Sequence, residues 1–210
     1  FKKQKPTTET VIKTKPTVFV FLKLLLASLL APNGDIKMKV MLDLETMGNN
    51  SNSAIIAIGA VAFDDNNVTS KFYAEVNLQS AIDNGGVVDG STMMWWLKQS
   101  DEARKAFENN DNAPHLMVAL SDFAKWYKEI NGDQVWGNGA MFDNTILGNA
   151  YKANNLEIPW KFWNDMCYRT VKGMYKHIKL ERVGTYHNAV DDAESQALHL
   201  IKILNSDKAS

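Results

Sequence analysis

The chain has 210 residues, of which 45% are hydrophobic and 22% are charged, with a formal net charge of −1. This composition predicts one folded domain with a sizeable core, and it excludes both a largely disordered chain and a strongly basic protein that coats nucleic acid. The single cysteine, Cys167, excludes an internal disulfide and a Cys/His zinc motif, and it favours a reducing, intracellular and cytoplasmic setting.

The first 37 residues differ in composition from the rest, with seven lysines and only two acidic residues. Their apolar run, residues 18–31, includes Lys23 and is shorter than the roughly 20 residues that span a bilayer, so we predict no membrane anchor. Three interpretations stay open: a signal peptide without the usual A-x-A cleavage pattern, an ordered extension, or a leader upstream of a natural start at Met38. We favour the leader, which assigns 1–37 to a non-domain segment and 38–210 to the domain.

The charge of the predicted domain differs from that of the whole chain. Residues 38–210 hold 16 basic and 22 acidic side chains, a net charge of −6. Bulk attraction therefore cannot hold a polyanion, and a nucleic-acid partner would need local basic groups or bound cations.

Three strands are predicted at the start of the domain. Val40–Leu44 is short and apolar, and Ser53–Asp64 is rich in Ile, Val and Ala and precedes a turn signal, "DDNN". Thr69–Val76 alternates between apolar and polar residues, which is typical of a strand with one exposed face.

Two short helices are predicted next. The stretch "STMMWWLKQ", residues 91–99, has Ser91 or Thr92 as its expected cap, and "DEARKAF", residues 101–107, has Asp101. Both caps are expected because their side-chain oxygens can accept a hydrogen bond from a backbone N–H of the first turn.

The second half of the domain alternates between helix and strand. We predict an amphipathic helix over 116–130, a fourth strand over 133–138, a helix over 142–154 and a terminal helix over 189–204. Three strands followed by helix–strand–helix units indicate an α/β fold with a mixed sheet and helices on its faces.

Several carboxylates fall where these elements begin or end. Asp43 and Glu45 are two residues apart on the first strand, so both project to the same face. Asp143 begins the helix after the fourth strand, and Asp191 and Asp192 lie in the first turn of the last helix. Because clustered carboxylates repel one another, a hard divalent cation such as Mg²⁺ or Mn²⁺ would stabilise them.

Each of these features also has an ordinary explanation when it is taken alone. A D-x-E pair is common in surface turns, and "NGAMFD" could be a loop before a helix. Asp191 and Asp192 could simply favour the helix dipole, and His187 could be a surface or capping residue. Their combined order is what favours a metal site.

In this order, "DLETMG", "GNGAMFD" and "HNAVDDAESQA" resemble the DEDDh 3′-5′ exonucleases, the histidine-containing branch of the DnaQ-like proteins. "MMWWLKQS" and "VWGNGAMFDNTIL…IPWKFWNDMCYRTV" are similar to the phage exonuclease A group and the mycobacterial-type exoribonuclease domain. The resemblance covers Met38 to Leu204. It implies a ribonuclease H-like fold with a mixed five-stranded sheet flanked by helices, and it adds a phage or prophage as one source of the chain.

The resemblance also implies a role for each polar group. Asp43, Glu45, Asp143 and Asp192 would hold two divalent metal ions, Mg²⁺ or Mn²⁺, and His187 would be the general base. Asp43 would bridge the two ions, Glu45 and Asp192 would complete the shell of one, and Asp143 would support the other. The implied reaction removes nucleoside 5′-monophosphates from the 3′ end of single-stranded DNA or RNA.

The choice of the last aspartate depends on spacing. The family pattern places it five residues after the histidine, which selects Asp192 over Asp191. The apolar stripe of the last helix agrees weakly with this choice, and Asp191 remains the alternative.

Expectations for the substrate end are less specific. The resemblance implies that Thr46, Met47 and Phe142 contact the terminal nucleotide. Four tryptophans could stack on unpaired bases or fill the core: Trp95, Trp96, Trp160 and Trp163. Arg169 and Lys172 could meet a phosphate or remain solvated.

Other classes of protein fit less well. An aspartyl phosphatase would carry D-x-D and would not need His187, and a ribonuclease H-type endonuclease usually lacks the histidine–aspartate spacing. A non-catalytic nucleic-acid-binding module would be expected to lose some of the acids. The preference for DNA or RNA and the oligomeric state, with a homodimer as one option, stay open.

Overall fold

A computed structural model describes residues 37–208 of the chain, with side chains to residue 206. The three interpretations of the N-terminal segment lie outside these residues, apart from Lys37. No helix in the described part is both long enough and apolar enough to cross a membrane.

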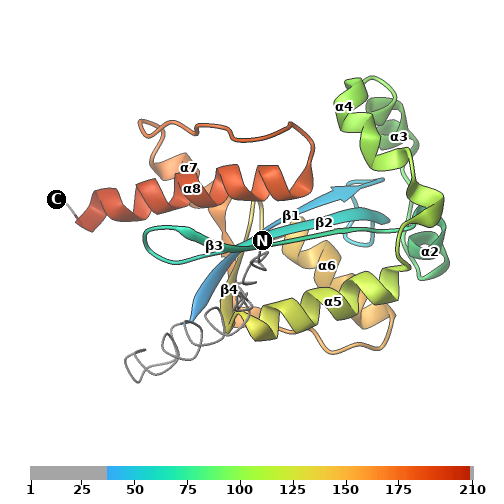
Figure 1. Ribbon diagram of the computed structural model, residues 1–210, viewed down its shortest axis with the longest axis horizontal. Helices are drawn as coiled ribbons and strands as arrows, with labels where there is room; N and C mark the ends of the chain where they lie inside the picture. The colour runs from blue at the N-terminus through green and yellow to red at the C-terminus, as the bar shows by residue number, and fades with distance from the viewer. Residues whose placement is uncertain (1–36, 209–210) are drawn as a thin grey trace, which may run out of the picture. The chain divides into compact units, whose positions relative to one another are not determined.

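The centre of the described domain is a mixed five-stranded sheet, as predicted, with strand order β3-β2-β1-β4-β5 (Figure 1). β1, β2 and β3 pair antiparallel, whereas β4 pairs parallel with both β1 and β5. The strands are β1 Met38–Thr46, β2 Ile55–Phe63, β3 Val68–Glu75, β4 Gly132–Gly137 and β5 Asp165–Cys167. The parallel pairing brings the carboxyl ends of β1, β4 and β5 to the same edge of the sheet.

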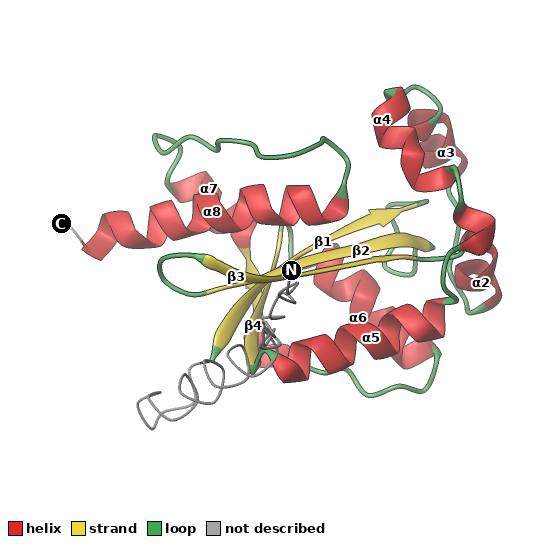
Figure 2. Ribbon diagram, viewed as in Figure 1, coloured by secondary structure: helices red, strands yellow, loops and turns green. Residues whose placement is uncertain are grey.

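Helices cover both faces of this sheet, with α8 on one side and α5 and α6 on the other (Figure 2). The longer helices are α5 Leu116–Glu129, α6 Asp143–Ala153 and α8 Ala189–Lys208. The shorter ones are α2 Leu78–Asp83, α3 Gly90–Trp96, α4 Asp101–Arg104 and α7 Tyr168–Met174. Three 3-10 turns complete the set: Lys105–Phe107, Asn110–Asn112 and Phe162–Asn164.

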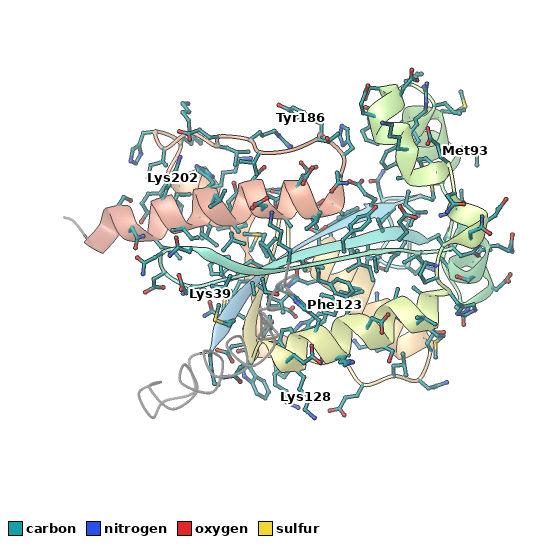
Figure 3. The ribbon with its side chains drawn as sticks, in the orientation of Figure 1. Lys39, Met93, Phe123, Lys128, Tyr186 and Lys202 are labelled. Carbon is teal, nitrogen blue, oxygen red and sulfur yellow. The ribbon has the colours of Figure 1, made fainter. Side chains whose placement is uncertain are left out.

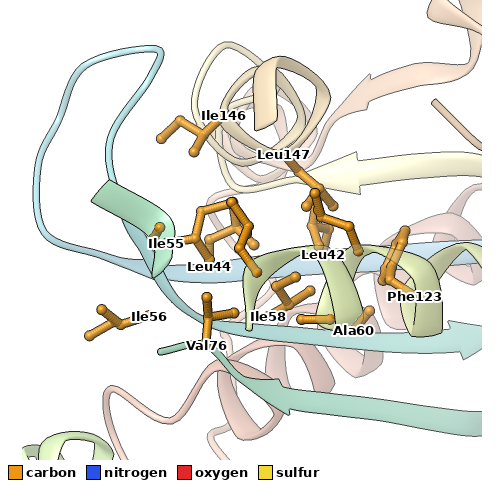
Figure 4. Packing of buried hydrophobic residues seen from close by; sticks show 14 of the residues in the cluster. Leu42, Leu44, Ile55, Ile56, Ile58, Ala60, Val76, Phe123, Ile146 and Leu147 are labelled. Atoms are coloured by element: carbon orange, nitrogen blue, oxygen red, sulfur yellow. The ribbon is translucent and has the colours of Figure 1, made fainter. Parts of the chain in front are cut away.

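The alternation of β1 divides the core in two. Leu42 and Leu44 pack with Phe123 and Leu147 on the side of α5 and α6 (Figure 4). Met41 points the other way and packs against α8. Because alternate residues of a strand face opposite sides, Asp43 and Glu45 lie on the same face as Met41.

Most predicted elements are confirmed, but the caps of two short helices are corrected. Asp89, rather than Ser91 or Thr92, caps α3 and accepts from the Ser91 backbone N–H. Ser100, rather than Asp101, caps α4. In both cases the capping oxygen lies one or more residues earlier, because the helix begins earlier than the apolar pattern indicates.

Three helices and strands were not predicted individually, α2, β5 and α7, and neither were the 3-10 turns Asn110–Asn112 and Phe162–Asn164. Strand β5 has three residues, and α2 and α7 have six and seven. Such short segments hold too few residues for a helical or strand period to appear.

Candidate metal centre and nucleotide cleft

Three carboxylates meet at the carboxyl end of β1. Oxygens of Asp43, Glu45 and Asp192 all lie within 4.8 Å of one another. The first two come from β1 and the third from the first turn of α8, so residues about 150 positions apart in the chain share one centre. The predicted projection of Asp43 and Glu45 to a common face is confirmed.

Gly59 allows α8 to approach so closely. It pairs directly with Asp43 across the antiparallel ladder. A Cβ at Gly59 would lie 2.1 Å from the carbonyl carbon of Ala189, a distance that real side chains do not tolerate. Small residues continue along the same helix face, since Ala193 and Ala197 are fully buried against the sheet.

Asp143 stands beside this group rather than within it. As the first residue of α6, it accepts from the Leu44 backbone N–H at 3.2 Å and from the Asn138 N–H at 3.1 Å. Its two oxygens are thereby tied to the ends of β1 and β4. The predicted fourth acid is close enough to raise the pKa of Asp43, but it lies outside the group whose oxygens converge.

The clustered acids are buried and repel one another, and both effects raise their pKa values. Burial, followed by the charges of Asp192 and Asp143, raises the pKa of Glu45 to about 8. Burial also raises the pKa of Asp143 to about 7, against the effect of its backbone hydrogen bonds. Burial and then three neighbouring carboxylates raise the pKa of Asp43, which a hydrogen bond from Gln196 partly offsets.

The donor set fits a hard divalent cation. All three converging groups are carboxylates, and Glu45 Oε1 is buried without a hydrogen-bond partner. A buried anionic oxygen that lacks a donor is costly, and a cation at the centre would neutralise it. In the described residues these three acids form the one cluster with metal-ligand spacing.

Hydrogen bonding separates the two adjacent aspartates of α8. Asp192 pairs with the guanidinium of Arg182 and accepts from the His187 backbone N–H at 3.3 Å. Asp191 instead accepts from the Thr185 N–H at 2.7 Å and so holds the preceding loop. This geometry supports Asp192 as the acid of the cluster.

His187 sits at the rim of the centre, on the turn just before α8. Its backbone is left-handed, with φ of 60°. Its ring packs edge-on against Trp95, with centroids 5.0 Å apart and an interplanar angle of 88°. Figure 3 shows the loop before α8, with Tyr186 labelled, and α3, with Met93 labelled.

A cleft with a volume of about 390 Å³ adjoins the acids. Its lining residues are Leu44, Glu45, Thr46, Asn49, Ser91, Thr92, Trp95, Trp96 and Phe142. Two of the three predicted substrate contacts, Thr46 and Phe142, therefore line it. Met47 does not line it: the residue is only 4% exposed and packs in the core, which argues against the predicted contact with the nucleotide.

The four tryptophans fall into two groups. Trp96 and Trp160 are buried in the core, so they fill space rather than offer a free face to a base. Trp96 also donates from Nε1 to the Thr46 carbonyl at 3.0 Å and so supports the floor of the cleft. Trp95 and Trp163 are exposed, and of these two only Trp95 lines the cleft.

The two predicted phosphate contacts have different surroundings. Arg169 lies against Gly139, and its charge offsets part of the rise in the pKa of Asp143, so it is near the acids. The Lys172 ammonium lies 5.7 Å from the centre of the Tyr168 ring.

Three residues at the site carried no signal in the sequence: Gly59, Arg182 and Gln196. Arg182 and Gln196 act through contacts with side chains from other positions in the chain, and Gly59 acts through close backbone approach. The residue type alone could not have identified them.

Comparisons with known proteins agree with this picture. A family model described as "3′-5′ exoribonuclease Rv2179c-like domain" matches residues 38–204. The exodeoxyribonuclease of Enterobacteria phage T4 is 29% identical over 156 residues, which cover 62% of this chain and 68% of that protein.

Solved structures share the fold at low sequence identity. A full-length 3′-exonuclease is 14% identical with a TM-score of 0.53, covering 81% of this chain and 83% of its own. Exonuclease X is 16% identical with a TM-score of 0.52, covering 80% and 92%. E. coli Exonuclease I is 13% identical with a TM-score of 0.53, covering 79% of this chain but 41% of its own. These likenesses confirm the predicted ribonuclease H-like fold, and the family match shows that the chain belongs to the 3′-5′ exoribonuclease Rv2179c-like domain family.

Proposed function

We propose that the protein is a DEDDh-type 3′-5′ exonuclease, with its domain at residues 38–210. It would hydrolyse single-stranded DNA or RNA from the 3′ end and release nucleoside 5′-monophosphates. The observation that carries the proposal is the convergence of Asp43, Glu45 and Asp192 beside His187 and the nucleotide-sized cleft.

The proposed cofactors are two divalent cations, Mg²⁺ or Mn²⁺. Asp43, Glu45 and Asp192 would hold one, with Asp143 supporting the second. When bound, such a pair neutralises charge on the phosphoryl oxygens and activates water for an in-line displacement. The unpaired Glu45 oxygen and the raised carboxyl pKa values support a cation at this position.

The remaining roles belong to side chains at the rim. The His187 imidazole would accept the proton of the attacking water, because histidine changes its protonation near neutral pH. Trp95 packs against the ring and limits its orientations. Thr46 and Phe142 would enclose the terminal nucleotide, since they line the cleft that leads to the acids.

The nucleic acids bound by the structural neighbours support the substrate class. E. coli Exonuclease I is complexed with a dT13 oligonucleotide and has a zinc-bound form with single-stranded DNA, and another neighbour is a 3′-exonuclease that recognises the 3′ end of a histone mRNA stem-loop. The family description names an exoribonuclease and the phage relative an exodeoxyribonuclease, so the proposal includes both sugars. We also propose a cytoplasmic location, which the lone cysteine supports.

The test is degradation of matched 5′-labelled DNA and RNA single strands with Mg²⁺. A ladder that shortens from the 3′ end, with circular single strands left intact, supports an exonuclease. Cleavage of the circles would indicate a ribonuclease H-type endonuclease, and binding without hydrolysis a non-catalytic module. Comparing the rates on DNA and on RNA decides which nucleic acid the enzyme prefers, because this preference depends on a contact to the 2′-hydroxyl.

Two variants serve as controls in the same assay. Asp43→Ala should remove activity together with cation binding. His187→Ala should lower the rate by about 10²- to 10⁴-fold, the usual contribution of a general base, while cation binding persists. A His187→Ala enzyme as fast as the wild type would remove the histidine from the mechanism.

A further inference from the structure

The geometry points to Gln196 as a positioning residue that orients Asp43 for cation binding, an inference that rests on the proposed function. Gln196 lies on α8, four residues after Asp192, so both side chains project from the same helix face. Its amide Nε2 donates to Asp43 Oδ1 at 2.7 Å. This bond joins two residues that are 153 positions apart in the chain.

The chemistry of a neutral amide suits this position. A hydrogen bond to one carboxylate oxygen fixes the rotation of the Asp43 side chain without neutralising its charge. A lysine or arginine here would compete with the cation, and an acid would add to the repulsion among Asp43, Glu45 and Asp192. Mutation of an outer partner that orients a metal ligand typically lowers metal affinity or activity by about 10- to 100-fold.

The other polar atom of the amide, Oε1, is buried as well. Gln196 is only 6% exposed, and its Oε1 is buried without a partner. In the described part of the chain, three buried side-chain atoms lack a partner: Glu45 Oε1, Asn144 Oδ1 and Gln196 Oε1. Such atoms are rare in folded proteins. Two of the three belong to the acid cluster or to a residue bonded to it, since Glu45 is one of the converging acids and Gln196 bonds Asp43. Two such atoms fit a centre that a cation and its water shell complete.

A purely structural role is the alternative, since the same bond ties α8 to β1. The neighbouring Ser195 has such a role, because its hydroxyl bonds the backbone of Val183 and of Asp191. The two roles differ in one respect. A structural tie changes stability equally with and without cation, whereas a positioning residue changes the stability that the cation adds.

The test measures that added stability. Gln196→Met keeps the volume of the side chain but removes the donor. Denaturant unfolding is compared in excess EDTA and in Mn²⁺, without nucleic acid, and the difference reports the affinity for Mn²⁺ whatever the baseline stability. We expect the Mn²⁺ dissociation constant to rise about 10- to 100-fold. At saturating Mg²⁺ the variant should show a lower kcat and an unchanged KM for a single-stranded oligonucleotide.

Two further variants keep the result decisive. Gln79→Leu is the matched control, because Gln79 makes the same kind of bond, to Asp83 at 2.8 Å, on the exposed surface of α2. It should leave Mn²⁺ stabilisation and kcat unchanged. If Gln196→Met does not fold, Gln196→Asn takes its place, since its amide is one methylene too short to reach Asp43, and the same weakening is expected.

Equal Mn²⁺ stabilisation in wild type and in the Gln196 variants would overturn the inference. This failure is distinct from failure of the proposed function. If the proposed function were wrong, Asp43→Ala would itself retain Mn²⁺ stabilisation and activity. If Asp43→Ala loses both while the Gln196 variants behave as wild type, only the positioning role is lost.

Discussion

The two faces of β1 carry different kinds of side chain and serve different purposes. Toward α5 and α6 it presents Val40, Leu42 and Leu44, all apolar and buried. Toward α8 it presents Met41 and then two acids, Asp43 and Glu45. One face stabilises the fold by burial of apolar surface, and the other concentrates negative charge that opposes folding and that a bound cation would offset.

The comparison shows how a strand can separate stability from chemistry. Side chains alternate across the sheet, so charges at positions 43 and 45 leave the packing of 42 and 44 intact. The change from apolar to acidic occurs along one face, between Met41 and Asp43. Changes on the acidic face should therefore alter cation binding and activity, and changes on the apolar face should alter stability.

The largest expected effect is on the acidic face. Asp43→Asn should lower exonuclease activity on the order of 10⁴-fold, as for groups that act as a unit in other hydrolases. The metal-free protein should be at least as stable as the wild type, because the change removes a crowded carboxylate whose pKa is raised. Single-turnover rates and denaturant unfolding in EDTA measure the two quantities. A variant that loses activity only because it unfolds would contradict the separation of the two faces.

On the apolar face, Leu42→Ala should cost about 2 to 5 kcal/mol of unfolding free energy, because Leu42 is fully buried and the change leaves a cavity. Mn²⁺ should still raise the unfolding free energy of this variant by as much as it raises that of the wild type. Loss of this gain in Leu42→Ala would show that the two faces are coupled.

Gly59 tests the contact on which the acidic face depends. Gly59→Ala should cost about 1 to 3 kcal/mol, since its Cβ would meet the Ala189 carbonyl carbon at 2.1 Å. It should also weaken Mn²⁺ binding by moving Asp192 away from β1. Gly173→Ala is the matched control, because a Cβ there meets nothing within 4 Å. Normal Mn²⁺ binding by Gly59→Ala would show that cation binding does not require the close approach of α8 to the sheet.

The smallest effect concerns pH. The folded pKa of Glu45, about 8, and that of Asp143, about 7, lie above their ordinary values of 4.5 and 3.8. The stability that these groups contribute is present below the ordinary values and is lost as pH rises through the folded ones. In EDTA, Tm should therefore fall by a few degrees between about pH 5 and 8. Mg²⁺ should reduce the fall, and a Tm that rises over this range in EDTA would contradict the pKa directions.

Local patterns predicted most of the longer elements and the acids that alternate along β1, because the period of a strand decides which side chains share a face. The family spacing selected Asp192, and the structure shows Asp191 bonded to Thr185 instead. Burial could not be predicted in the same way. Met47 and Trp160 belong to the core, where Trp160 packs against Phe123 of α5, and no local pattern reveals that Gln196 reaches Asp43.

The most direct test of a cation centre between β1 and α8 is a Mn²⁺ titration of three proteins by calorimetry: the wild type, Asp192→Asn and Asp191→Asn. The two aspartates are adjacent and carry the same charge, but only Asp192 belongs to the acid cluster, so the pair controls for the loss of one charge. We predict binding to the wild type and to Asp191→Asn, with affinity reduced by more than about 100-fold in Asp192→Asn, beyond the usual effect of an outer partner. Equal Mn²⁺ affinity of Asp192→Asn and the wild type would contradict the account.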